Sequence, residues 1–159
     1  MSRVYEGSID GRGRRVAIAA SRFNRLVTDP LVAGAVSELR RHGVAADDID
    51  LAWVPGAFEL PLVARNLAAS DRFDAVVCLG AVIRGETDHH RHVAGQAAAG
   101  IQRVMLDTGV PCIFGVLTTD TLEQALDRAG GGHGNRGWDA ATAAIETAGL
   151  LEDLSKREG

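Results

Sequence analysis

His89 and the polar segment before it are the residues whose types and order most clearly indicate chemistry. They follow an apolar run over residues 75–82, which is typical of a strand buried on both faces. Asp88 is a suitable N-cap for a helix that begins at His89, so the loop amides lack backbone partners and favour an anion. A neutral imidazole beside them can accept and release protons. The pattern predicts an acid–base residue beside a phosphate site formed by Gly85, Glu86 and Thr87.

Two other interpretations apply to the same segment. A strand, a glycine-containing turn and a capped helix also make an ordinary α/β connection that binds nothing. The histidines suggest a metal, since His89 and His92 share a helix face, but no Cys, Asp or Glu stands nearby at a complementary spacing. No metal site is therefore predicted.

A second loop, residues 55–59, carries a further candidate group. Gly56 lets the backbone approach a ligand closely, and Glu59 either caps the following helix or accepts hydrogen bonds from hydroxyls. Aromatic rings lie at or near predicted strand ends, where they either stack on a flat ligand or pack in the core. These rings are Phe23, Phe58 and Phe114.

Alternating strands and helices must position these groups. The predicted strands cover residues 15–20, 49–54, 75–82 and 112–117. A first helix begins near Thr28 or Asp29, with Pro30 in its first turn, and ends at Gly43. The second helix has Pro61 in its first turn, and its residues Leu62, Val63 and Leu67 are expected to face the sheet. The third helix covers about residues 89–106. The fourth follows an N-cap cluster at 118–120, and a last helix covers about 138–154 after an irregular glycine-rich stretch, 130–137.

This alternation predicts an α/β fold, in which a four-stranded parallel sheet lies between two helix layers. Ligands of such folds bind beyond the carboxyl ends of the strands, where the strand order reverses. The loops at 21–24, 55–59 and 83–89 each follow a strand, so all three are expected at that edge. We expect one domain over residues 14–159 and a loosely tied N-terminal arm over 1–13.

Composition excludes several classes of protein. The net charge is −4 and basic residues do not cluster, which argues against nucleic acid as a partner. The N-terminus lacks a signal pattern, and no apolar run approaches the roughly 20 residues that span a bilayer, so a cytoplasmic protein without a membrane partner is expected. Cys78 and Cys112 fall inside predicted strands and are interpreted as packing residues.

Five segments taken together resemble the 6,7-dimethyl-8-ribityllumazine synthases. They are Ser-Arg-Phe-Asn at 21–24, Pro-Gly-Ala-Phe-Glu-Leu-Pro at 55–61, the segment 79–89, Phe-Gly-Val-Leu-Thr-Thr at 114–119 and the segment 123–130. The resemblance implies a flavodoxin-like sheet with strand order 2-1-3-4. It also implies condensation of 5-amino-6-(D-ribitylamino)uracil with 3,4-dihydroxy-2-butanone 4-phosphate, which releases phosphate and water without a metal or redox cofactor.

The resemblance further implies a role for each matching residue. Phe23 stacks on the pyrimidine, the backbone of Ala81, Val82 and Ile83 contacts the uracil edge, and Ala57, Phe58 and Glu59 hold the ribityl chain. Gly85, Glu86 and Thr87 bind phosphate, and His89 is the acid–base residue. Phe114 and Arg128 reach the site of a neighbouring subunit, where Arg128 pairs with phosphate.

This chain departs from the family pattern at three positions. Arg136 stands where the family has Lys in an Asn-Lys-Gly segment, which keeps a charge for the phosphate but changes its reach. His90 replaces an aromatic residue. Glu86 places a carboxylate beside the phosphate site, which requires that its amide, not its side chain, faces the ligand.

Assembly is also implied by the resemblance. Members of the family form pentamers, and some pack twelve pentamers into a sixty-subunit shell. The short connection over 130–137 lacks the insertion typical of free pentamers, which favours the shell, and the arm then joins a neighbouring subunit. Riboflavin synthase is a candidate protein partner.

Two other classes share parts of this pattern. A non-catalytic flavin or lumazine carrier needs Phe23 and Glu59 but has no use for His89 or Arg128. A receiver-like signalling domain requires acidic residues after the first strand. This chain has Ala-Ser-Arg-Phe at residues 20–23, none of which is acidic.

Overall fold

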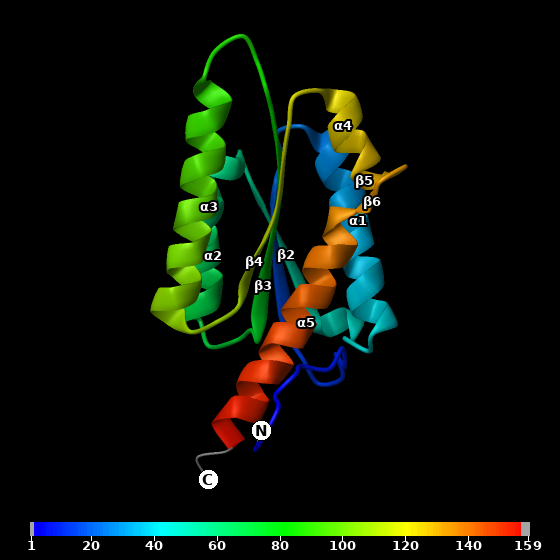
Figure 1. Cartoon of the computed structure of the whole chain (residues 1–159), viewed down its shortest axis with the longest axis vertical. Coiled ribbons are helices and arrows are strands. Elements are labelled where there is room, and N and C mark those ends of the chain that lie inside the picture. Colours follow the sequence, from blue (N-terminus) through cyan, green and yellow to red (C-terminus); the bar gives the residue numbers. More distant parts are fainter. Residues whose placement is uncertain (1, 157–159) are drawn as a thin grey trace.

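A four-stranded parallel sheet forms the middle layer of the protein, in a computed structural model that describes residues 2–156. The strand order is β2-β1-β3-β4, as the resemblance implied. Helices α2 and α3 cover one face, and α1 and α5 cover the other (Figure 1). The chain therefore has the three-layer α/β/α, flavodoxin-like fold that the alternation of elements predicted. The strands are β1 (Val16–Ser21), β2 (Ile49–Val54), β3 (Ala75–Ile83) and β4 (Cys112–Thr119).

The two central strands carry the hydrophobic core on both of their faces. Every residue of β1 is buried, and so are the first eight residues of β3. Such strands can pair only within the sheet, because each face must lie under helices. Ile18 and Val77 face α1 and α5, whereas Ala19 and Cys78 face α2 and α3.

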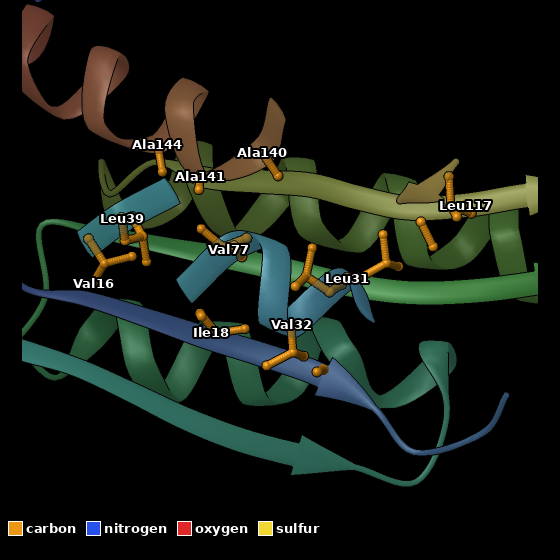
Figure 2. Close-up of a cluster of buried hydrophobic side chains, with 14 of the residues drawn as sticks. Val16, Ile18, Leu31, Val32, Leu39, Val77, Leu117, Ala140, Ala141 and Ala144 are labelled. Atoms are coloured by element: carbon orange, nitrogen blue, oxygen red, sulfur yellow. The ribbon is translucent and has the colours of Figure 1, made fainter. Parts of the chain in front are cut away.

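Close packing of α1 (Arg25–Arg41) and α5 (Arg136–Ser155) builds the first core cluster (Figure 2). Apart from Ile145, the buried face of α5 consists of small residues, including Ala141 and Ala144, which let the helix approach α1 closely. At the tightest point, a Cβ added to Gly137 would overlap the carbonyl oxygen of Leu31. Complete burial of a side chain such as Leu31 contributes about 1.5–3 kcal/mol.

The second cluster lies under α2 (Leu60–Ala69) and α3 (His89–Thr108). Leu60, Ala64 and Ala68, spaced by four, form the inward stripe of α2. The prediction that Leu62 faces inward is wrong, since that side chain is 66% exposed. The 3₁₀ turn η2 (Ala57–Glu59) leads directly into α2, whose first residue, Leu60, is fully buried in this cluster.

Helix α1 begins earlier than predicted. Its first turn starts at Arg25, because the carbonyl of Asn24 accepts the amides of Val27 and Thr28 at 2.9 and 3.1 Å. Pro30 thus lies inside the helix and not in its first turn. A proline is typical of helix starts but does not prove one, because the preceding turn can form without its N–H.

Two predictions around α4 (Leu122–Asp127) are also corrected. The N-cap is Thr121, whose hydroxyl accepts the amide of Gln124 at 3.2 Å in a capping box, while residues 118 and 119 extend β4. The glycine-rich stretch after α4 is regular, since β5 (Ala129–Gly131) and β6 (Gly134–Asn135) pair as a short hairpin. Gly130 and Gly134 have φ angles of 108° and 80°, which favour glycine.

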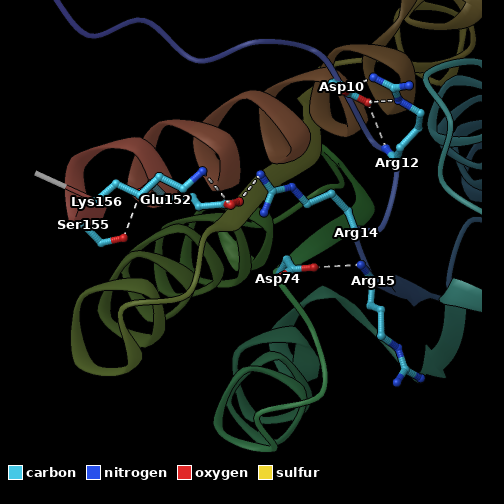
Figure 3. Close-up of polar contacts among 8 residues, drawn as sticks. All are labelled: Asp10, Arg12, Arg14, Arg15, Asp74, Glu152, Ser155 and Lys156. Carbon is cyan, nitrogen blue, oxygen red and sulfur yellow. Dashed lines mark hydrogen bonds and ion pairs between the residues drawn. The ribbon is translucent and has the colours of Figure 1, made fainter. Parts of the chain in front are cut away.

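The N-terminal arm runs beside α5 of its own chain (Figure 3). Arg14 forms an ion pair with Glu152, and hydrogen bonds from Arg14 lower the pKa of that carboxyl. Hydrogen bonds from the Arg12 side chain and backbone likewise lower the pKa of Asp10 to about 2. The amide of Gly11 donates to the carbonyl of His42 at 2.8 Å. The Gly11 bond ties the arm to the domain that follows it, whereas Asp10 and Arg12 pair within the arm.

Asn135 should contribute strongly to stability, because its buried amide joins three elements. Its Oδ1 accepts the amides of Gly137 and Trp138 at 2.7 and 3.3 Å, and its Nδ2 donates to the carbonyl of Pro30 at 3.2 Å. We expect Asn135→Ala to lower the free energy of unfolding by about 2 kcal/mol, as loss of an N-cap and a buried hydrogen bond requires. Urea unfolding measures this. Asn66→Ala is the control, since exposed Asn66 makes one 3.3 Å bond, and equal stability of the two variants would contradict the assignment.

Both cysteines are buried free thiols, and neither should react in the native protein. Burial raises the pKa of Cys78 far above its ordinary value and that of Cys112 to about 11. Since the thiolate is the reactive form, we expect Ellman's reagent at pH 8 to modify neither residue until denaturant is added. Rapid modification of one thiol without denaturant would show that this part of the core opens readily.

Candidate active site

A cavity of about 540 Å³ opens at the carboxyl ends of β1, β2 and β3. Strand β2 pairs with one side of β1 and β3 pairs with the other side. The strand order therefore reverses between β1 and β3. Ligands of parallel α/β sheets bind at such a reversal. The loops predicted to share this edge do so, and they contribute Phe23, Asn24, residues 55–59, Ala81, Val82 and Ile83, while α3 adds His89, His92 and Val93.

The loop after β1 is held by backbone hydrogen bonds to its neighbours. The amides of Arg22 and Phe23 donate to the carbonyls of Val54 and Pro55 at 2.8 and 3.1 Å. Asn24 adopts the left-handed conformation, with a φ of 65°, and its Nδ2 donates to the carbonyl of Ala81 at 3.1 Å. These bonds fix the backbone on both sides of Phe23, whose side chain is 70% exposed and lines the cavity.

A cation–π contact adds to this support. The guanidinium of Arg25 lies 4.1 Å from the centre of the Trp53 ring, and its Nε donates to Asp29 Oδ1 at 2.9 Å. Trp53 is the residue before the last one of β2, so the contact ties the start of α1 to the end of that strand. The Phe23 loop is thus fixed at both its ends.

The loop after β2 presents an acceptor to the cavity. Glu59 occupies the N-cap position of α2, but its side chain makes no capping hydrogen bond. Of the two roles that the sequence left open, the capping role is therefore wrong for this structure. The carboxylate lies near Gly56, where an added Cβ would stand 3.6 Å from Glu59 Oε1, and both residues line the cavity.

The loop after β3 forms the rim next to α3. The amide of Arg84 donates to the carbonyl of Thr119 at 2.9 Å, which ties the start of the loop to β4. Asp88 does not cap α3 with its side chain, contrary to the prediction; the amide of His89 instead donates to Thr87 Oγ1 at 3.4 Å. Residues 85–88 are exposed in the loop just before His89, where an anion could reach them.

Six predicted site residues do not line this cavity in a single chain. Gly85, Glu86 and Thr87 lie in the loop between β3 and α3, and Phe114, Arg128 and Arg136 stand on other elements. Phe114 is 42% exposed and sits near the amino end of β4, where its Cα pairs with Cys78. Arg128 follows α4, with its Nη1 donating to the carbonyl of Gln124 at 3.0 Å, and Arg136 starts α5 beyond the hairpin. Phe114, Arg128 and Arg136 are positioned by β4, α4, the hairpin and α5, and not by the loops that build the cavity.

The sequence prediction omitted several residues that line the cavity. Asn24 enters that prediction only as part of a motif, Val93 is not singled out, and His92 is considered only as a metal ligand. The spacing of three and four residues from His89 is the signal that could have placed His92 and Val93 on its wall.

Two further features of residues 2–156 bear on the chemistry. This part of the chain contains no group of three or more His, Cys, Asp or Glu side chains arranged to hold a metal ion. It also contains no helix that is both long and apolar enough to cross a bilayer.

Fold and cavity together define a flavodoxin-like α/β protein with a small-molecule site that carries an aromatic ring, a carboxylate and imidazoles. The family model for 6,7-dimethyl-8-ribityllumazine synthase matches residues 13–152, so the chain belongs to the lumazine synthase family. The chain is thus a transferase of riboflavin biosynthesis that acts on small molecules and assembles with copies of itself, and the carrier alternative is not favoured.

Asn24 should be needed for tight binding, because it holds the Phe23 loop against β3. We expect Asn24→Ala to weaken binding of the lumazine product about fivefold or more, since it loses a hydrogen bond worth about 1 kcal/mol and the left-handed preference. Quenching of lumazine fluorescence measures the Kd. Asn24→Gly keeps the backbone freedom and should lose less, so a larger loss in the glycine variant, or none in either, would refute this role.

Proposed function

We propose that the cavity at the carboxyl ends of β1, β2 and β3 is where 5-amino-6-(D-ribitylamino)uracil and 3,4-dihydroxy-2-butanone 4-phosphate are joined. One observation carries this proposal: three separate loops bring Phe23, Glu59 and His89 to one cavity of about 540 Å³. A flat ring, a polyhydroxyl chain and a reacting carbonyl need an aromatic face, an acceptor and a proton carrier, respectively.

The uracil ring lies between Phe23 and the end of β3 in this proposal. Phe23 is exposed on a backbone fixed by hydrogen bonds, so its ring can stack on the pyrimidine at little entropic cost. The polar edge of the base then reaches backbone groups of Ala81, Val82 and Ile83, where β3 ends and pairing with β1 has already stopped. Backbone groups at a strand end are suitable partners for an amide edge.

The ribityl chain extends along η2. Ala57 is buried and Phe58 is 59% exposed, so η2 offers both a floor and an apolar side wall. Glu59 has no capping hydrogen bond, which leaves its carboxylate oxygens available to accept from ribityl hydroxyls. Acceptance of a hydroxyl by a charged carboxylate is worth about 1.5–3 kcal/mol.

The phosphate group binds at the start of α3. Gly85, Glu86 and Thr87 are exposed in the loop that precedes a helix of 20 residues, and the N-terminus of that helix favours an anion. Glu86 takes part through its amide, with its side chain in solvent. Arg128 and Arg136, together with Phe114, complete the site from a neighbouring subunit, because none of them lines the cavity of its own chain.

The chemistry depends on orientation and on proton transfer. The amine of one substrate attacks the ketone of the other to form an imine, phosphate leaves, and the second amine closes the ring. Holding two reactants in register can supply about 7–11 kcal/mol of the barrier reduction. His89 carries protons to and from the reacting nitrogen and oxygen atoms, which adds about 10²–10⁴-fold.

The assembly proposed is a pentamer and, from the shortness of the segment over 130–137, a sixty-subunit shell. That segment forms the tight β5–β6 hairpin, which supports the proposal because it leaves no long loop to obstruct contacts between pentamers. The N-terminal arm contacts an adjacent subunit in such an assembly, and riboflavin synthase is the protein partner. Two free thiols are compatible with a cytoplasmic location.

Substitution of His89 and Arg128 separates the two main roles. We expect His89→Ala to lower kcat by about 10²–10⁴-fold with little change in product binding, because the ring moves protons and does not hold the ligand. Arg128→Ala should mainly raise the KM of the phosphate substrate, as loss of a charge-assisted bond requires. Lumazine formation is followed by absorbance and fluorescence.

Arg103→Ala is the matched control, since Arg103 is an exposed arginine that pairs with Asp107 on α3. Unchanged turnover in His89→Ala would remove that residue from its role. A folded wild-type protein that binds lumazine but forms none would support the carrier instead.

A further inference from the structure

His92 is a titratable side chain of the cavity to which the roles above assign no function. Its neighbours on the cavity wall include the titratable groups Glu59 and His89. Most of the remaining lining is apolar, including Phe23, Phe58 and Val93. A second imidazole in an apolar cavity therefore needs an explanation.

Helix geometry places His92 beside His89. Residues three apart on a helix are neighbours on its surface, so the two rings occupy adjacent positions on α3. The same face continues through Val93 to the buried residues Ala97 and Ile101, whose packing fixes the rotation of the helix. The position of His92 on the cavity wall thus follows from the core of the protein.

His90 provides the contrast within the same turn. Its Nδ1 lies 3.1 Å from the carbonyl oxygen of Thr87, and it does not line the cavity. Two of the three histidines in this turn therefore face the proposed substrates, while the third is engaged with the preceding loop.

We propose that His92 is a second acid–base residue of the condensation, acting together with His89. The inference rests on the proposed role of His89. In the carbinolamine formed when the amine adds to the ketone, His92 as imidazolium donates its proton to the hydroxyl, the C–O bond breaks, and water leaves. The nitrogen electron pair forms the C=N bond, and neutral His89 accepts the proton that this nitrogen loses. One proton enters the substrate and one leaves it, so the charge of the pair is unchanged.

Two imidazoles suit this step better than one. Dehydration needs a donor at oxygen and an acceptor at nitrogen during the same event, and a single ring can serve only one of them at a time.

The test compares His92→Gln with His90→Gln in the full-length protein. Glutamine keeps much of the size and hydrogen-bonding capacity of histidine but exchanges no proton. We expect His92→Gln to lower kcat about a hundredfold, with less than a threefold change in either KM or in the Kd of the lumazine product. His90→Gln should retain the wild-type kcat, since its ring lies off the cavity wall.

The outcomes separate this inference from the function on which it rests. If His89→Gln slows turnover and His92→Gln does not, the inference fails and the proposed role of His89 stands. A rise in KM at unchanged kcat would make His92 a binding residue and would also overturn the inference. Absence of lumazine formation in the wild type would overturn both. Should His92→Gln fail to fold, as judged by circular dichroism, His92→Phe provides the same comparison.

Discussion

Burial of the two central strands on both faces is the constraint on which the rest of the structure depends. Apart from Ser21 at the end of β1, the side chains of β1 and β3 are apolar or absent and alternate towards opposite helix layers, so both layers must be present for either strand to be stable. Parallel pairing of such strands brings all their carboxyl ends to one edge. Strands β2 and β3 lie on opposite sides of β1, so the connections that follow β1 and β3 run in opposite directions. They leave a cavity between them at this edge of the sheet.

Hydrogen bonds to neighbouring strands hold the loops around that cavity in place. The Phe23 loop is tied to β2 through two amides and to β3 through Asn24, while the loop after β3 is tied to β4 through Arg84. Each tether joins a loop to a neighbouring strand, so the loops are held relative to one another. Side chains that the proposed chemistry uses, Phe23 and His89 among them, can then remain exposed without losing their positions.

The division of residues between cavity and exterior suits a protein that works as an assembly. The first three strand–helix units supply an aromatic ring, a carboxylate and imidazoles, whereas the arginines proposed for phosphate stand on the fourth unit and on α5. Membership of a homo-oligomeric family agrees with this separation.

Local chemistry determined much of this protein directly from the sequence: four apolar runs, the strand–helix alternation and the five motifs predicted the layers, the strand order and the family. Boundaries decided by competing local signals were less predictable. Pro30 suggested a late start for α1, and residues 118–120 suggested a cap that Thr121 provides instead. Only the tertiary structure decided that the Glu59 side chain does not cap its helix and that Leu62 points outward. The orientation of Leu62 depends on the rotation of α2 against the sheet, which packing sets and local sequence does not encode.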